Sequence, residues 1–201
     1  SMKIDVIVPV YKPDRELFAL LDSLNKQTLP VNQIILMNTE AEGFATKDIK
    51  ERVEKVARKE DNRNCAPVKV RIVSVEKKDY DHGGTRNLAA GCYTEGEYFL
   101  CMTQDAVPYD DVLIEELLKV LKKENVASVY GKQLARENSH ILENFTRKFN
   151  YPDESRMKSK ADLEALGIKT YFCSNVCAAY KREIYDKLGG FIKKTIFNED
   201  M

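Results

Sequence analysis

Several patterns that mark common protein classes are missing from this sequence. No apolar run approaches the roughly 20 residues that a membrane-spanning helix needs, and the N-terminus lacks the charged and apolar regions of a signal peptide. Basic and acidic residues each number 32, so the formal net charge is zero and the balance does not favour nucleic acid as a partner. Any anionic ligand must therefore be bound by a local group of residues.

The histidines are too few for a common zinc site, and the cysteines are too scattered for a common metal site or a disulfide framework. The two histidines stand far apart, which argues against zinc. The five cysteines form no CxxC pair, and we interpret them as core residues of a protein from a reduced, cytosolic compartment. The motifs GxGxxG and GxxxxGK[ST] are absent, so a dinucleotide-binding enzyme and a P-loop NTPase lose their main support.

Apolar runs alternate with amphipathic segments through the first two thirds of the chain. We expect strands at residues 4–10, 33–37, 68–75, 98–102 and 126–130, with helices between most of them. This alternation predicts an α/β fold with a doubly wound, mostly parallel sheet flanked by helices. Between residues 131 and 170 the periodicity loosens, and we expect an excursion over the sheet before a strand at 171–180 and a short helix at 182–188.

Polar residues follow several of the expected strands. In an open α/β sheet, ligands bind at the carboxyl ends of the strands, so the positions to inspect are 11–12, 38–40, 79–87 and 103–105. An enzyme of nucleotide sugars needs groups that wall and read a base, neutralise a diphosphate and protect a glycosyl cation. The residue types at these positions can supply all of these groups.

Six short motifs occur in order along the chain: DHGGTRN at 81–87, TQDA at 103–106, YGKQL at 130–134, FNYP at 149–152, SNVCAAY at 174–180 and NED at 198–200. Together they resemble the rhamnosyltransferase-like branch of glycosyltransferase family 2, over essentially the whole chain. The resemblance implies a GT-A fold and inverting transfer of a sugar from a nucleoside diphosphate to an acceptor hydroxyl. For this branch it also implies L-rhamnose, donated by dTDP-rhamnose during synthesis of bacterial cell-surface polysaccharide.

The resemblance also suggests a metal ligand and a catalytic base. Asp105 occupies the last position of the DxD motif of the wider family, which holds Mg²⁺ or Mn²⁺ against the diphosphate, whereas Thr103 replaces the first aspartate. Without the family, Asp105 would be interpreted as the cap of a turn before Pro108. Asp200, with Glu199 in reserve, matches the acidic pair that supplies the base. Taken alone, two acids near a chain end more often form a solvated tail.

A further group of residues is expected around the donor. Tyr11 either stacks on the base or packs at the sheet edge. Where the wider family has an aspartate that accepts a hydrogen bond from the pyrimidine, this chain has Asn38, and Glu40 two residues later is an equal candidate. Arg86 offers a guanidinium to the nucleotide or its phosphates, while His82 is either a donor-pocket residue or a loop residue. The full expected set is Pro9, Tyr11, Asn38, Glu40, Asp81, His82, Arg86 and Gln104.

We expect a single GT-A domain over residues 1–201, truncated at its C-terminus, with donor binding over about residues 1–110 and acceptor binding over about 111–201. The expected partners are a nucleotide-sugar donor and a glycan or lipid-linked glycan acceptor. The expected location is the cytoplasm, either free or at the inner face of the cell membrane. The basic run at 119–123 is either the wet face of a helix or a contact to anionic lipid. Two alternatives stay open, a UDP-hexose donor and a catalytically degenerate sugar-nucleotide-binding domain.

Overall fold

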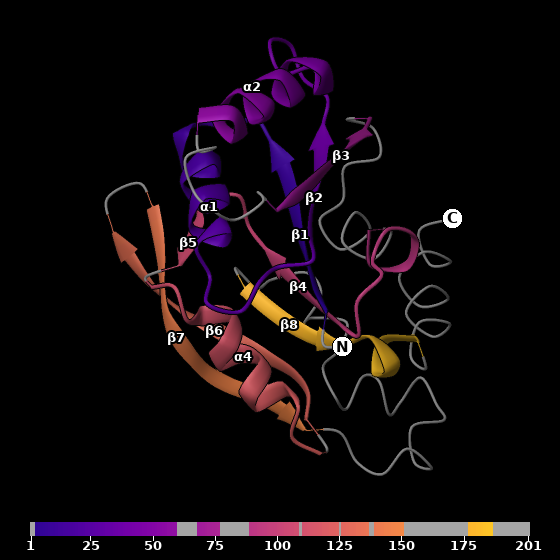
Figure 1. Cartoon of the computed structure of the whole chain (residues 1–201), viewed down its shortest axis with the longest axis vertical. Coiled ribbons are helices and arrows are strands. Elements are labelled where there is room, and N and C mark those ends of the chain that lie inside the picture. The colour runs from indigo at the N-terminus through magenta and orange to yellow at the C-terminus, as the bar shows by residue number, and fades with distance from the viewer. Residues whose placement is uncertain are drawn as a thin grey trace.

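The computed structural model describes residues 3–59, 68–76, 89–108, 110–124, 126–136, 139–150 and 177–186. Strands and helices alternate through its first half, as the periodicity predicts (Figure 1). Residues 89–92 and 182–186 are also helical. The elements are β1 (Ile4–Tyr11), α1 (Arg15–Asn25), β2 (Gln33–Thr39), α2 (Thr46–Lys59), β3 (Lys69–Val75), β4 (Tyr98–Met102), β5 (Ala106–Pro108), α4 (Leu113–Leu121), β6 (Val126–Arg136), β7 (Ser139–Asn150) and β8 (Cys177–Lys181).

One sheet of eight strands organises the described part, in the order β3-β2-β1-β4-β8-β6-β7-β5. The first four strands in this order are parallel, and β1 lies between β2 and β4. β8 then pairs antiparallel with β4 on one side and with β6 on the other. The expected α/β class with a largely parallel sheet is therefore confirmed, and β8 is the strand at which the direction reverses.

The expected excursion over residues 131–170 is wrong for its first half. Residues 131–136 continue β6, and 139–150 form β7, which pairs antiparallel with β6 through three register irregularities. Residues 151–170 lie outside the described part. The periodicity missed this hairpin because its strands are held by backbone pairing to β8, β5 and each other, which does not require an alternating apolar pattern.

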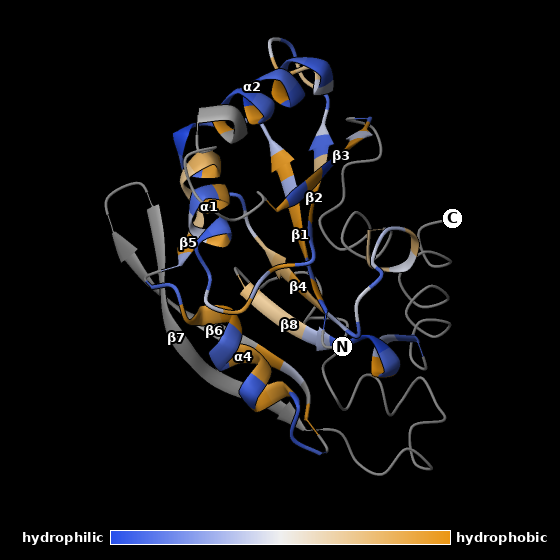
Figure 2. Ribbon diagram, in the orientation of Figure 1, coloured by the Kyte–Doolittle hydropathy of each residue, from blue (hydrophilic) through white to orange (hydrophobic). Residues whose placement is uncertain are grey.

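Helices cover both faces of the parallel strands. Alternate residues of β1 (Ile4, Val6, Val8 and Val10) belong to one core cluster with the apolar faces of α1, α2 and α4. Figure 2 shows hydrophobic stripes on α1 and α4, with polar residues between them. On the opposite face, the Phe99 ring stacks on Tyr180 and meets Tyr185 edge-on, with ring centroids 5.2 and 5.3 Å away. Within the described part, no helix has both the length and the apolar character to cross a bilayer.

A buried carboxylate joins the amino ends of β1 and β4. Asp5 is fully buried, and its Oδ1 accepts a hydrogen bond from Asn32 Nδ2 at 2.6 Å. Its Oδ2 accepts from the backbone N–H groups of Glu95 and Gly96, at 2.6 and 2.7 Å. A Cβ at Gly96 would lie 2.4 Å from the Lys3 carbonyl oxygen, so only glycine permits this approach. Asp5 thereby anchors the loop that leads into β4.

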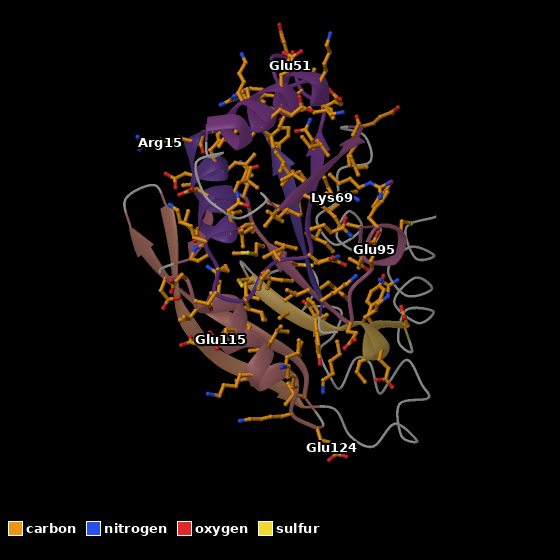
Figure 3. The ribbon with its side chains drawn as sticks, viewed as in Figure 1. Arg15, Glu51, Lys69, Glu95, Glu115 and Glu124 are labelled. Atoms are coloured by element: carbon orange, nitrogen blue, oxygen red, sulfur yellow. The ribbon has the colours of Figure 1, made fainter. Side chains whose placement is uncertain are left out.

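We predict that Asp5→Asn destabilises the fold by about 2–3 kcal/mol, because the new NH₂ group must face an N–H donor in a site built for a carboxylate. Urea denaturation of the two proteins measures the difference. Glu51→Gln, on an outward-pointing side chain of α2 (Figure 3), is the matched control and should change stability by less than about 0.5 kcal/mol. Equal stability of wild type and Asp5→Asn would contradict the anchoring role.

Candidate functional site

The carboxyl ends of three neighbouring strands bring polar residues to one edge of the sheet. β1 and β2 end in register, with Val10 opposite Asn38 and Tyr11 opposite Thr39. β4 pairs with the other side of β1 and ends at Met102, directly before Thr103. The structure therefore brings together three of the predicted regions, at 11–12, 38–40 and 103–105. Asp81, His82, Arg86, Glu199 and Asp200 lie outside the described residues.

Three buried side-chain oxygens at this edge have no hydrogen-bond partner among the described residues. They are Asn38 Oδ1, Thr39 Oγ1 and Thr103 Oγ1. A buried polar atom without a partner costs about 1–3 kcal/mol, so native structures contain few of them. Asn38 and Thr39 are consecutive in β2 and face opposite sides of the sheet, so unpaired polar atoms lie on both sides of this edge, and Asn38 Oδ1 in particular can accept a hydrogen bond from a ligand.

The two candidates for reading a base, Asn38 and Glu40, have different surroundings. Glu40 Oε1 accepts hydrogen bonds from the Thr46 backbone N–H at 3.1 Å and from Ser74 Oγ at 2.9 Å. The pKa of the Glu40 carboxyl is lowered from its ordinary value. The largest cause is the Thr46 side chain, followed by the bonds from Ser74 and from the Thr46 backbone N–H, and all three favour the ionised carboxylate. Glu40 is thus occupied in capping α2, whereas Asn38 keeps an unpaired oxygen.

Gln104 extends the pairing of β1 with β4 beyond the last residues of the ladder. Its Oε1 accepts from the Tyr11 N–H at 2.8 Å, and its Nε2 donates to the Tyr11 carbonyl at 3.0 Å. Pro9 lacks an N–H and lies two residues before Tyr11, after the last β1–β4 pair at Ile7 and Cys101. The backbone N–H groups of a strand alternate in direction, so the nitrogen of Pro9 faces β4, as the N–H of Tyr11 does. The β1–β4 ladder has ended before this point, so no N–H is needed there. Gln104 therefore positions Tyr11 at the site.

Lys12 follows β1 in a left-handed conformation, with φ of +45°. This conformation is uncommon for a residue with a side chain, and such strain gathers at ligand sites. The Lys12 ammonium lies 5.4 Å from the centre of the Tyr11 ring and is exposed. The sequence marked this position for inspection but indicated no role, and the structure adds a cation beside Tyr11.

Asp105 lies in the turn that follows β4, where the Ala106 N–H donates to the Thr103 carbonyl at 3.1 Å. Its side chain is half-buried. Within the described ranges, no three Asp, Glu, His or Cys side chains group as a ligand set for a metal ion. As far as the described residues go, Asp105 would be a single carboxylate beside a cation, and phosphate oxygens and water are further ligands that Mg²⁺ accepts.

The sequence predicted Thr46 only as a helix cap and gave Ser74 no role, whereas the structure places both in this network. Ser74 pairs with Asn38 in the β2–β3 register, so it stands at the same edge of the sheet. Its position near the end of a strand was the available signal. Thr46 starts α2, and only the path of the loop after β2 brings its hydroxyl to Asn38.

A comparison with protein families gives one assignment. The profile described as Glycosyl transferase family 2 matches residues 5–189. The chain belongs to this family. The match includes every described residue that lies at the carboxyl edge of the sheet.

Two curated relatives of this family 2 chain are O-antigen chain rhamnosyltransferases. The first is RfbN of Salmonella typhimurium, 36% identical over 200 residues, with 100% of this chain and 59% of that protein covered. The second is WbaN of Salmonella anatum, 41% identical over 143 residues, covering 71% of this chain and 45% of that protein. The chain thus spans roughly half the length of the curated relatives that it matches.

Solved structures share the fold at low sequence identity. The mannosyltransferase PcManGT of Pyrobaculum calidifontis, in complex with GDP-Man and Mn²⁺, superposes with a TM-score of 0.60 at 17% identity, covering 93% of this chain and 46% of that one. Staphylococcus aureus TarS gives 0.55 at 18%, with 94% and 49% covered. Glucosyl-3-phosphoglycerate synthase of Mycobacterium tuberculosis gives 0.52 at 16%, with 91% and 57% covered. The expected GT-A fold is confirmed.

The contacts of Glu40 predict a dependence of stability on pH. Because the folded-state pKa of Glu40 lies below its ordinary value of 4.5, the ionised carboxylate stabilises the fold above that value. This contribution is lost as the pH falls through the lowered pKa. Glu40→Gln should therefore reduce the free energy of unfolding at neutral pH, and the difference from wild type should shrink well below pH 4.5. Urea denaturation at both pH values measures it, and a constant difference would contradict the charged cap.

Proposed function

We propose that this chain binds dTDP-rhamnose and belongs to an inverting rhamnosyltransferase of cell-surface polysaccharide synthesis. The observation that carries the proposal is the relation to two O-antigen chain rhamnosyltransferases over 71–100% of the chain. The acceptor-rich carboxyl edge of the sheet supports it, since a thymine base presents an N–H group.

The donor is proposed to lie across the carboxyl ends of β1, β2 and β4. Asn38 Oδ1 accepts the N3–H of the base, and the Tyr11 ring, placed by Gln104, walls its face. Arg86 contacts the diphosphate through its guanidinium. Lys12 adds a cation beside Tyr11.

Asp105 is the residue proposed to hold Mg²⁺ or Mn²⁺, together with phosphate oxygens and water. The bound cation would neutralise charge on the leaving diphosphate. PcManGT and the mycobacterial synthase were solved with Mn²⁺, which supports the assignment for this chain. Asp105 stands near the end of β4, at the edge where Asn38 offers its free oxygen.

The proposed base is Asp200, with Glu199 in reserve. The carboxylate takes the proton of the acceptor hydroxyl as its oxygen attacks the anomeric carbon from the side opposite the diphosphate. The bond from the anomeric carbon to the diphosphate breaks as the new glycosidic bond forms, so the configuration inverts. The proposed acceptor is a glycan or lipid-linked glycan at the inner face of the cell membrane, where the basic run at 119–123 can approach anionic lipid.

Two other functions are distinguished by experiment. Titration calorimetry with dTDP-rhamnose, UDP-glucose and UDP-galactose, each with and without Mn²⁺, should give the tightest binding for dTDP-rhamnose. Preference for a UDP-hexose would support another family 2 donor. In the full-length protein, Asp200→Asn should lower rhamnosyl turnover by at least about 10²-fold with donor affinity nearly unchanged. Donor binding with no transfer by the wild type would support a degenerate binding domain.

Asp105→Ala tests the metal assignment. The variant should lose the Mn²⁺-dependent part of its dTDP affinity and keep its metal-free affinity, because the removed carboxylate acts through the cation. Calorimetry with and without Mn²⁺ measures both parts. Asp110→Ala, in the polar segment just before α4, is the control and should retain the Mn²⁺ effect. An unchanged Mn²⁺ effect in Asp105→Ala would remove Asp105 as the ligand.

A further inference from the structure

The direction of the Asn38 side-chain amide is determined by its neighbours. Asn38 is fully buried, and its Nδ2 donates to the Phe44 carbonyl at 3.2 Å and to Thr46 Oγ1 at 2.9 Å. A carbonyl oxygen can only accept, so the nitrogen must face Phe44. The amide oxygen then points away from both groups and has no partner among the described residues.

Glu40 reinforces this direction through the Thr46 hydroxyl. An ionised carboxylate can only accept hydrogen bonds, and the Thr46 hydroxyl has one proton to give. The Thr46 side chain is the largest cause of the lowered pKa of that carboxyl, and the Thr46 backbone N–H donates to Glu40 Oε1 at 3.1 Å. Thr46 Oγ1 in turn accepts from Asn38 Nδ2 at 2.9 Å. Glu40, Thr46 and Asn38 thus form a chain of hydrogen bonds that runs in one direction.

Ser74 and the Thr46 backbone hold the start of this chain. Both donate to Oε1 of Glu40, at 2.9 and 3.1 Å. Each donor favours the ionised carboxylate, which can only accept. The polarity is therefore set by backbone and side-chain groups of β3 and α2, outside the proposed base pocket.

We propose that the Glu40–Thr46 pair acts as a positioning device that presents Asn38 Oδ1 as an acceptor, so that the site selects bases carrying an N–H at the pyrimidine 3-position. This inference rests on the proposed function and deepens it. A thymine or uracil ring fulfils the requirement, and cytosine does not, because its N3 is itself an acceptor. Glu40 and Thr46 select the base without touching it.

Asn38 could have a simpler, structural role, in which its Nδ2 acts only as a latch that holds the loop between β2 and α2. Such a latch would use only Nδ2 and would gain nothing from a buried oxygen without a partner. Thr39 and Thr103 have unpaired oxygens at the same edge, which a latch does not explain either. A ligand donor facing Asn38 Oδ1 accounts for the arrangement.

Two nucleotides of nearly equal shape and opposite polarity test the proposal. They are dTDP, with a donor at N3, and 5-methyl-dCDP, with an acceptor there. Calorimetry on the chain should give a preference of wild type for dTDP of at least about tenfold. Thr46→Val and Glu40→Gln should each reduce this ratio by at least about threefold, because the amide is then less firmly directed. Thr46→Ser, which restores the hydroxyl, should recover the wild-type ratio.

Glu42→Gln is the matched control for the loss of charge, since Glu42 is an exposed residue of the same loop, and it should keep the wild-type ratio. A purely structural role would weaken both nucleotides equally in Thr46→Val and Glu40→Gln and leave the ratio intact, which would overturn the inference. Equal affinity of wild type for both nucleotides would overturn it too, while nucleotide binding itself would stand. No binding of either nucleotide by wild type would remove the proposed function together with the inference.

Discussion

The in-register parallel pairing of β1 with β2 and β4 is the constraint on which the rest of the site depends. It sets Asn38 opposite Val10 and Thr39 opposite Tyr11, and it places the turn after β4 beside the end of β1. A shift by one residue would turn each buried side chain to the opposite face of the sheet. The core on both faces therefore specifies the register, and the register in turn places the polar edge.

Side chains hold both ends of this pairing where the backbone ladder stops. At the amino end, the Asp5 carboxylate ties β1 to the turn before β4. At the carboxyl end, the Gln104 amide bonds both backbone groups of Tyr11. Pro9 offers no N–H toward β4, and the β1–β4 ladder ends at Ile7 and Cys101, so on this side Gln104 makes the bonds to Tyr11. A ligand site on strand ends fixed in this way is more precise than a site on free loops.

The sequence predicted β1 to β4, α1, α2 and α4 because their apolar residues recur with the period of a strand or helix. It predicted only the first residues of β6, at 126–130, and not the hairpin with β7, because β6 is held by β8, a strand far later in the chain, and β7 by β6 and β5. For the site, the rule of strand ends located Tyr11, Asn38, Gln104 and Asp105. It could not tell that Gln104 bonds the backbone of Tyr11, since the partner of a side chain is decided by tertiary contacts.

Two residues at the carboxyl edge, Asn38 and Thr103, depart from the pattern of the wider family, and both are neutral. On the resemblance described above, Asn38 and Thr103 stand where the wider family is expected to have aspartates, so each would remove one negative charge from the carboxyl edge. Each also leaves a neutral oxygen unpaired at that edge. At the proposed donor site, a diphosphate would meet less repulsion than at a site with both carboxylates, because like charges in a partly buried site interact strongly. Less positive charge would then be needed to balance the diphosphate. A single carboxylate, Asp105, to hold a cation, together with the Lys12 ammonium at the same edge, is consistent with this smaller need.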